Sequence, residues 1–264
     1  MHHKEIDMKL TVLEYELSET VAIITMNHPP VNALGVEFLE DFNSVLNHLQ
    51  YKPARAMLIR SACPGFFSAG DDIVSLQEID DELINTLPRA HALLNALEEL
   101  PLPTVAALNG HALGGGLELA LTCDFRFMGD AAGRIGLPEV RLGMIPSLGG
   151  TQRLPLIVGR ARAIEMMYKG LQLTPAAAKE AGLITDIFPQ DQLDERSLDY
   201  AKRLARQATA ALGRIKTCIN TGIREGFSAG LAMEYDMFKD NIRSRDAKEG
   251  IAAFLNNRKP EFRG

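Results

Sequence analysis

The first sixty residues alternate between two hydrophobic patterns. Residues 10–17 and 20–26 are rich in valine, isoleucine, threonine and tyrosine, and the polar pair Ser18-Glu19 separates them. This arrangement predicts two strands joined as a hairpin. Apolar side chains then recur at helical spacing over residues 36–49, and residues 54–60 again have the composition of a strand. The repeating unit predicted here is strand, strand, helix.

A similar alternation continues through the middle of the chain. Residues 103–109 predict a strand that leads into a glycine run, a short helix is expected to about residue 122, and residues 124–128 predict a further strand. Strands that alternate with helices in this way are typical of a mixed α/β domain with helices packed on a sheet.

The pattern becomes helical from about residue 159. Residues 160–169 and 174–181 predict helices, with Thr174 as N-cap and Pro175 at the first helical position. Residues 184–188 predict one last strand, and long helices follow Pro189. We therefore expect a core over residues 8–190 and a helical carboxy-terminal region over residues 191–264. No low-complexity linker separates the two, so both should belong to one globular unit.

Composition and charge narrow the classes of function. The chain has 264 residues, 46% of them hydrophobic, and a formal charge of −6, which argues against a dedicated nucleic-acid binder. Three cysteines without Cys-x-x-Cys spacing indicate neither a disulfide framework nor a zinc site. The amino terminus lacks an apolar signal segment and no run has membrane-spanning length. We expect a cytoplasmic protein with free thiols and no membrane partner.

Two motifs carry the candidate chemistry. Three consecutive glycines, Gly114-Gly115-Gly116, stand just before Glu118, and Glu139 follows Pro138 at a distance of twenty-one residues from Glu118. Taken singly, the first glutamate is an ordinary helix-start residue and the second an ordinary turn residue. Glycines let backbone approach a ligand, and a helix start offers unpaired amides. The combination predicts anion-stabilising amides beside a carboxylate acid or base.

These runs, together with Phe67-Ser-Ala-Gly-Asp-Asp-Ile73 upstream, closely resemble the enoyl-CoA hydratase (crotonase) family, and the resemblance covers nearly the whole chain. The resemblance implies a ClpP-like spiral of strand-strand-helix units and a helical carboxy-terminal region that makes trimers, often paired into hexamers. It also implies a hydro-lyase that adds water reversibly, and syn, to a trans-2-enoyl-CoA. Neither metal nor cofactor is implied, because CoA arrives as part of the substrate.

The resemblance assigns roles to particular residues. Glu139 would exchange a proton with the α-carbon, and Glu118 would activate or orient the water. The backbone amides of Asp71 and Gly115 would form an oxyanion hole for the thioester carbonyl, where each preorganised donor is worth about 3–4 kcal/mol in comparable sites. Because backbone does this work, the acidic side chain of Asp71, where relatives often carry alanine, does not forbid the role.

Further positions would contact the substrate by the same resemblance. Ser147 stands where hydratases typically have a glycine whose amide helps to position the water, and Val74 replaces a lysine of well-known members. Phe254 and the basic pair Arg258-Lys259 would bind the nucleotide end of CoA, although helix packing and a solvated terminus explain them almost as well. The helix expected over about 81–97 would cover the acyl chain, whose identity the sequence does not specify. The remaining expected contacts with substrate or CoA are Val31, Ala33, Ala69, Asp72 and Ile73.

Alternative readings remain at this point. Within the family, an enoyl-CoA isomerase and a hydratase of a cyclic or branched acyl-CoA are both open, whereas a non-catalytic CoA-binding or RNA-binding relative conflicts with the two glutamates or with the acidic charge. The segment Gly226-Phe-Ser228-Ala-Gly230 matches a nucleophile elbow, but no histidine follows it. The glycine run lacks the third glycine of a dinucleotide fingerprint. His111 is expected to be structural, with a proton carrier as the alternative.

Overall fold

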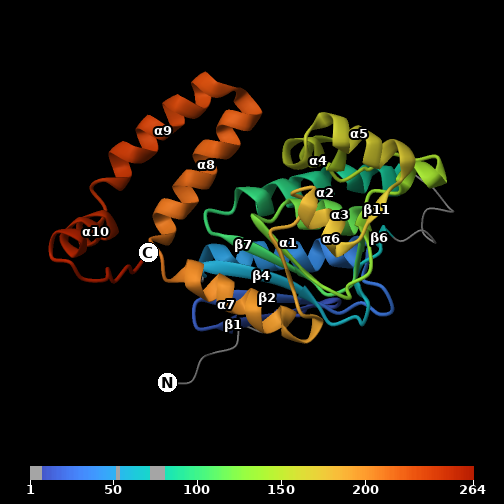
Figure 1. Ribbon diagram of the computed structural model, residues 1–264, viewed down its shortest axis with the longest axis horizontal. Helices are drawn as coiled ribbons and strands as arrows, with labels where there is room; N and C mark the ends of the chain where they lie inside the picture. Colours follow the sequence, from blue (N-terminus) through green and yellow to red (C-terminus); the bar gives the residue numbers. More distant parts are fainter. Residues whose placement is uncertain (1–7, 52–53, 72–80) are drawn as a thin grey trace.

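The computed structural model describes residues 8–51, 54–71 and 81–264. Most of this chain forms a layered α/β body, from which three helices extend as an arm (Figure 1). The arm consists of α8 (Thr209–Glu225), α9 (Phe227–Asn241) and α10 (Arg245–Leu255). Among the described helices, none is both long and apolar enough to cross a membrane.

A six-stranded main sheet forms the centre of the body. Its order is β1 (Leu13–Ser18), β2 (Val21–Met26), β4 (Ala56–Ser61), β7 (Thr104–Leu108), β9 (Phe125–Gly129) and β12 (Asp186–Phe188). The predicted hairpin is confirmed, because β1 pairs antiparallel with β2 and Ser18 opposes Val21. The other pairs are parallel. A parallel sheet must be covered on both faces, and all six residues of β2 are buried.

Side chains of the main sheet alternate between two hydrophobic clusters. Val21 and Ile23 pack with α7 (Leu193–Ala205) on one face, whereas Ala22 and Ile24 join the larger cluster on the other face. This period of two is the alternation expected for a strand. The larger cluster lies between the main sheet and the layer that carries the candidate site.

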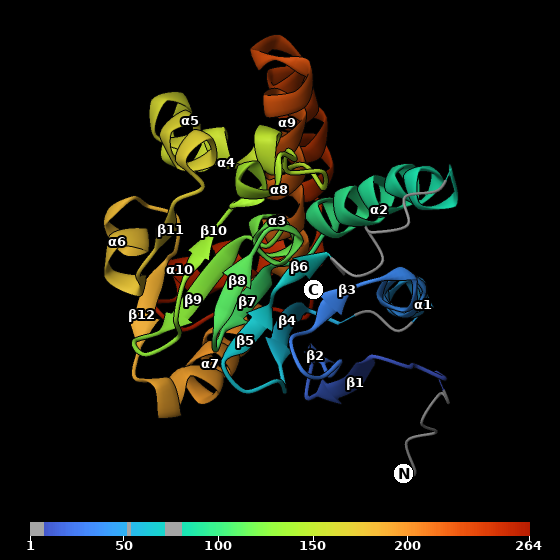
Figure 2. The ribbon, with the colours of Figure 1, turned by 90° about the vertical axis from the view of Figure 1, so that its right-hand side faces the viewer.

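A second, smaller sheet lies in that layer (Figure 2). Its order is β11 (Gln172–Leu173), β10 (Ile135–Gly136), β8 (His111–Leu113) and β5 (Phe66–Ser68), and β3 (Ala33–Leu34) pairs with β6 (Gly70–Asp71) beside it. The chain passes repeatedly from a main-sheet strand to a short strand here and then to a helix. These helices are α1 (Val36–Tyr51), α2 (Asp81–Glu99), α3 (Gly115–Leu121) and α4 (Gly150–Val158).

The strand-strand-helix unit predicted from the sequence is therefore confirmed, with a spiral in which the second strand of each unit leaves the main sheet. The remaining helical segments are η2 (Glu139–Leu142), α5 (Arg160–Lys169), α6 (Pro175–Glu180) and η3 (Gln190–Gln192). Thr174 caps α6 as predicted, because its hydroxyl accepts a hydrogen bond from the amide of Ala177 at 3.3 Å.

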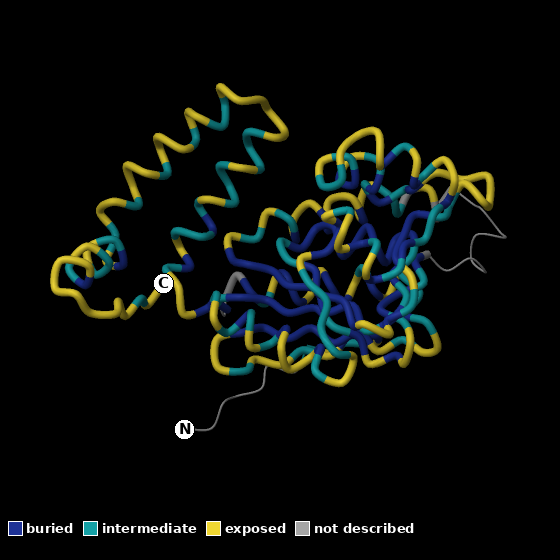
Figure 3. The backbone as a smooth tube through the Cα atoms, viewed as in Figure 1, coloured by how far each residue is buried: buried dark blue, intermediate teal, exposed yellow. Residues whose placement is uncertain are grey.

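The arm begins after α7, because α7 still packs on the main sheet whereas α8 extends away from the body (Figure 1). Figure 3 shows the buried residues concentrated in the body, whereas the arm is mostly half-buried or exposed. Within the arm, α8 and α9 approach at two glycines, and a Cβ atom at Gly230 would lie 2.8 Å from the Cα atom of Gly222. Gly230 thus serves helix packing, and Ser228 stands in the first turn of α9 instead of on a strand-to-helix elbow.

Candidate active site

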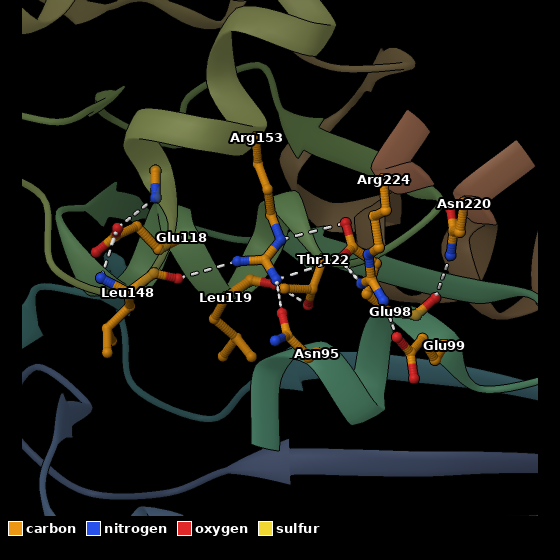
Figure 4. Close-up of polar contacts among 11 residues, drawn as sticks. Asn95, Glu98, Glu99, Glu118, Leu119, Thr122, Leu148, Arg153, Asn220 and Arg224 are labelled. Carbon is orange, nitrogen blue, oxygen red and sulfur yellow. Dashed lines mark hydrogen bonds and ion pairs between the residues drawn. The ribbon is translucent and has the colours of Figure 1, made fainter. Parts of the chain in front are cut away.

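Glu118 is a buried carboxylate held by backbone. Every residue of α3 is buried, and Glu118 Oε1 accepts hydrogen bonds from the amides of Leu148 at 2.8 Å and Gly150 at 2.6 Å (Figure 4). Gly150 is the first residue of α4, so the carboxylate also lies at a helix amino terminus. Two amide donors and the helix dipole both stabilise negative charge on this oxygen.

Glu139 approaches the same glycine turn from another element. It opens η2 directly after Pro138 and is half-buried. A Cβ atom at Gly114 would lie 3.3 Å from Oε1 of Glu139, which places the carboxylate against the residue that caps α3. The structure therefore brings both predicted glutamates to the segment from Gly114 to Glu118.

The two backbone segments of the predicted oxyanion hole also meet. Gly70 has a φ of +95°, and a Cβ atom there would lie 2.8 Å from the carbonyl oxygen of Leu113 and 3.0 Å from the amide nitrogen of Gly115. Both the backbone angle and the close approach require glycine. Strand β6, which ends at Asp71, thus runs against the start of α3, and the role of the two amides stays a prediction.

A buried polar network fixes the neighbouring loops. The Asn32 side chain donates to Ser61 Oγ at 2.7 Å and to the Phe67 carbonyl at 3.0 Å. The Ser68 hydroxyl donates to the Asn32 carbonyl at 2.7 Å and accepts from the Gly70 amide at 3.1 Å. These bonds tie β6 to the loop before β3, and the sequence offered no signal for them, since isolated asparagine and serine residues usually indicate exposed turns.

The expected CoA path partly follows this network. The amide of Ala69 donates to the carbonyl of Val31 at 2.9 Å, and Ala33 pairs with Gly70 in the β3–β6 ladder. The structure therefore gathers Val31, Ala33 and Ala69 beside β6. The predicted contacts Asp72 and Ile73, and the departure at position 74, lie outside the described residues.

Ser147 is half-buried, and its carbonyl accepts a hydrogen bond from His91 Nε2 at 2.5 Å. The amides that hold Glu118 belong to its neighbours Leu148 and Gly150. Sequence reasoning missed those two donors, although the pair Gly149-Gly150 before an apolar helix is a signal for a helix terminus that binds an anion.

Phe254 belongs to α10, which lies at the end of the arm and away from α3, the helix of Glu118 (Figure 1), and Arg258 follows α10 by three residues. Phe254 is exposed, and Arg258 forms two hydrogen bonds with Glu249, at 2.6 and 2.8 Å. These hydrogen bonds from Arg258, together with a hydrogen bond from the backbone amide of Glu261, lower the pKa of Glu249 to about 2. The same pairing raises the pKa of Arg258.

His111 and Arg126, two further groups near α3, contact neighbouring protein groups in ways that indicate a structural role. The His111 ring lies 5.2 Å from the Phe66 ring centroid and against Gly133, in agreement with a packing role. Arg126 donates to the carbonyls of Leu183 and Cys123, the latter just beyond the end of α3. Burial lowers the pKa of Arg126 and raises the pKa of the Cys123 thiol to about 12.

The described residues contain no group of three or more His, Cys, Asp or Glu side chains that could hold a metal ion. The site brings together two carboxylates, one held by amides at a helix start and one beside a glycine turn. Such a pair suits proton transfer to and from a substrate whose negative charge the backbone amides can receive.

Comparison with known proteins gives a consistent result. The sequence model of enoyl-CoA hydratase/isomerase matches residues 16–264. A Mycosarcoma maydis protein named enoyl-CoA isomerase/hydratase fer4 is 38% identical, over 88% of each chain. The Escherichia coli 2,3-dehydroadipyl-CoA hydratase is 37% identical, over 93% of this chain and 96% of its own. A solved enoyl-CoA hydratase from Geobacillus kaustophilus has a TM-score of 0.93 at 38% identity, covering 97% of this chain and 98% of its own.

Proposed function

Because this chain belongs to the enoyl-CoA hydratase/isomerase family, we propose that it catalyses the reversible syn addition of water to trans-2-enoyl-CoA thioesters. The observation that carries this proposal is that the Glu139 carboxylate lies against Gly114, the N-cap of the same short helix, α3, that carries Glu118. Addition of water needs one group to handle the nucleophile and another to deliver a proton to carbon.

The proposed steps follow from the surroundings of each carboxylate. Glu118, ionised and held by the amides of Leu148 and Gly150, accepts a proton from water while the water oxygen bonds to C3. The π electrons of the C2–C3 double bond move to the thioester oxygen, where the amides of Asp71 and Gly115 would stabilise the enolate. Glu139 then gives its proton to C2 as the enolate collapses, and proton exchange with solvent restores both carboxyl groups.

A product assay tests the reaction class. Purified protein should convert short trans-2-enoyl-CoA to 3-hydroxyacyl-CoA without added metal or nicotinamide, and exhaustive chelation should leave the rate unchanged. The assay should include several chain lengths and one branched substrate. No hydration of any straight-chain enoyl-CoA would remove the general hydratase from consideration.

A second candidate is isomerisation of a 3-enoyl-CoA or hydration of a specialised acyl group. Its support lies in the relatives, because one is named an isomerase/hydratase and another is named for a dehydroadipyl group. The product assay separates these possibilities when 3-enoyl-CoA and a dicarboxylic enoyl-CoA are added to the substrate set.

We also propose that the chain assembles into a trimer or a dimer of trimers. The arm exposes more apolar surface than a monomer usually leaves in water. The exposed large apolar residues are Ile215, Ile219, Ile223, Phe227, Leu231, Tyr235, Phe238 and Ile242 along α8 and α9, and Ile251, Phe254 and Leu255 on α10. Light scattering should give at least three times the chain mass of 28.9 kDa. A mass equal to that of one chain at micromolar concentration would refute this assembly.

A further inference from the structure

The turn that holds Glu118 is itself held by a buried arginine. Arg153, on the first turns of α4, donates from Nη1 to the carbonyl of Leu148 at 3.0 Å, and Leu148 is one of the two residues whose amides bind Glu118 (Figure 4). The Arg153 side chain passes so close to Gly149 that a Cβ atom there would lie within 2.2 Å of Nη1. A side chain at position 149 would therefore displace the Arg153 guanidinium, and the φ of +99° there also favours glycine.

One face of α2 supplies the partners of Arg153. The Arg153 guanidinium donates to Asn95 Oδ1 at 2.7 Å and to both carboxylate oxygens of Glu98 at 3.2 Å. His91 lies one helical turn before Asn95, and its Nε2 lies 2.5 Å from the carbonyl oxygen of Ser147, which belongs to the loop that holds Glu118. Residues at spacings of four and three share a helix face, so α2 contacts the Glu118 turn along a single stripe.

Glu98 also joins α2 to the arm. Its Oε2 accepts a hydrogen bond from Arg224 of α8 at 2.7 Å, and its backbone carbonyl accepts one from Asn220 at 3.2 Å. Arg224 contacts Glu99 as well. Figure 4 shows the resulting line of contacts, which runs from Glu118 through the turn and Arg153 to Glu98 and α8.

We propose that Arg153 and Glu98 are positioning residues that hold the amides of Leu148 and Gly150 on the Glu118 carboxylate and link that arrangement to the arm. This inference rests on the proposed function for its kinetic consequence, but the hydrogen bonds themselves do not depend on the reaction. Neither residue would touch substrate. Their effect on turnover would pass through the position of Glu118.

The planar guanidinium is suited to this task because it donates at once to three residues, Leu148 in the loop before α4 and Asn95 and Glu98 on α2. Only a fork of several N–H donors reaches the Leu148 carbonyl, the Asn95 amide oxygen and the Glu98 carboxylate together. The Arg153 side chain is largely buried and that of Glu98 partly buried, so water cannot simply replace either partner. Arg224 is more exposed, and its contribution should be smaller.

Kinetics of four variants and one control variant test the proposal. Arg153→Met should lower kcat for hydration by about 10²-fold, as misplacement of a reacting group does, while KM changes by less than about threefold. Arg153→Lys keeps the positive charge but not the planar set of N–H donors, so its kcat should lie between those of Arg153→Met and the parent protein. Glu98→Gln should lower kcat by about tenfold and Arg224→Met by about threefold, in order of increasing distance from Glu118. Arg214→Met, on the same arm helix but bonded to Asn241, is the matched control and should leave both constants unchanged.

Amide hydrogen exchange provides a readout that does not need activity. Peptides that contain residues 147–150 should exchange faster in Arg153→Met and Glu98→Gln than in the parent protein, whereas those of the Arg214→Met control should not. If Arg153→Met does not fold, the Glu98→Gln comparison stands alone. Unchanged exchange in a folded variant, or a kcat within about twofold of the parent for Arg153→Met, would overturn the proposal. A parent protein without hydratase activity would overturn the proposed function and leave the exchange test intact.

Discussion

Glu118 and Glu139 carry the same carboxylate group in opposite kinds of surroundings. Glu118 lies on a helix whose residues are all buried, and two amides of a separate helix start hold one of its oxygens. Glu139 opens a single turn of 3-10 helix in which no residue is buried, and the apolar side chains that follow it point outward. Carboxylate oxygens of both residues are buried, but α3 is buried along its whole length, whereas η2 presents exposed side chains that a substrate can cover.

The difference agrees with the two roles in the proposed reaction. A carboxylate that orients water gains from fixed geometry and from stabilised negative charge, which the amides of Leu148 and Gly150 provide. A carboxyl group that gives a proton to carbon must face the substrate directly, and the Glu139 carboxylate lies against Gly114, next to the Gly115 amide proposed to bind the thioester oxygen. The predictions below test whether the two regions differ in function as they differ in structure.

Glu139→Gln should have the largest effect. Loss of the proton donor to C2 should suppress both hydration and exchange of the α-proton by about 10²–10⁴-fold, with little change in KM because glutamine keeps the side-chain volume. Hydration can be followed by loss of the conjugated thioester, and exchange by mass spectrometry in deuterated water. Retention of α-proton exchange near the parent rate would assign the proton transfer to another group.

Glu118→Gln should separate the two reactions of the family. Hydration should fall by a similar order, because the amide cannot accept the proton of water, but a 3-enoyl-CoA should still isomerise at a measurable rate through Glu139 alone. The measurement is the ratio of hydration to isomerisation in one protein sample. Hydration at near the parent rate in correctly folded protein would refute the two-glutamate mechanism and favour the isomerase.

Gly150→Ala should disturb Glu118 without removing it. The new Cβ atom would lie 2.9 Å from Glu118 Oε1 and 2.7 Å from Leu137 Cδ1, so the carboxylate must shift from its amides. We expect kcat to fall by about 10–10²-fold at nearly constant KM. Gly250→Ala is the matched control, because its nearest neighbour would be Phe262 at an ordinary 3.4 Å. Equal activity of the two variants would show that Glu118 tolerates displacement.

The sequence predicted the main strands and helices better than it predicted the hydrogen bonds that hold Glu118 in place. Residues 21–26 have the composition of a strand and residues 160–169 the pattern of a helix, but the strands of the second sheet span two or three residues, too few for either signal to appear. The spacing of the two glutamates identified the candidate carboxylates. The amides that bind Glu118 were not predicted, because backbone amides carry no side-chain signature. The pairing of Arg153 with Glu98 was not predicted either, because 55 residues separate the two in the sequence.

Ile145→Ala should give the smallest effect and test the open side of the comparison. Ile145 is 75% exposed, so its truncation should change the free energy of unfolding by less than about 0.5 kcal/mol. An exposed apolar side chain six residues after Glu139 is nevertheless available to contact an acyl chain, and loss of methyl groups that the substrate would bury should raise KM by about three- to tenfold. The increase should be larger for long enoyl-CoA than for short, since only a long chain extends past the reacting carbons. A KM that rises equally for all lengths would mean that this region binds the thioester end instead, and an unchanged KM would mean that the exposed turn after Glu139 serves no substrate contact at this position.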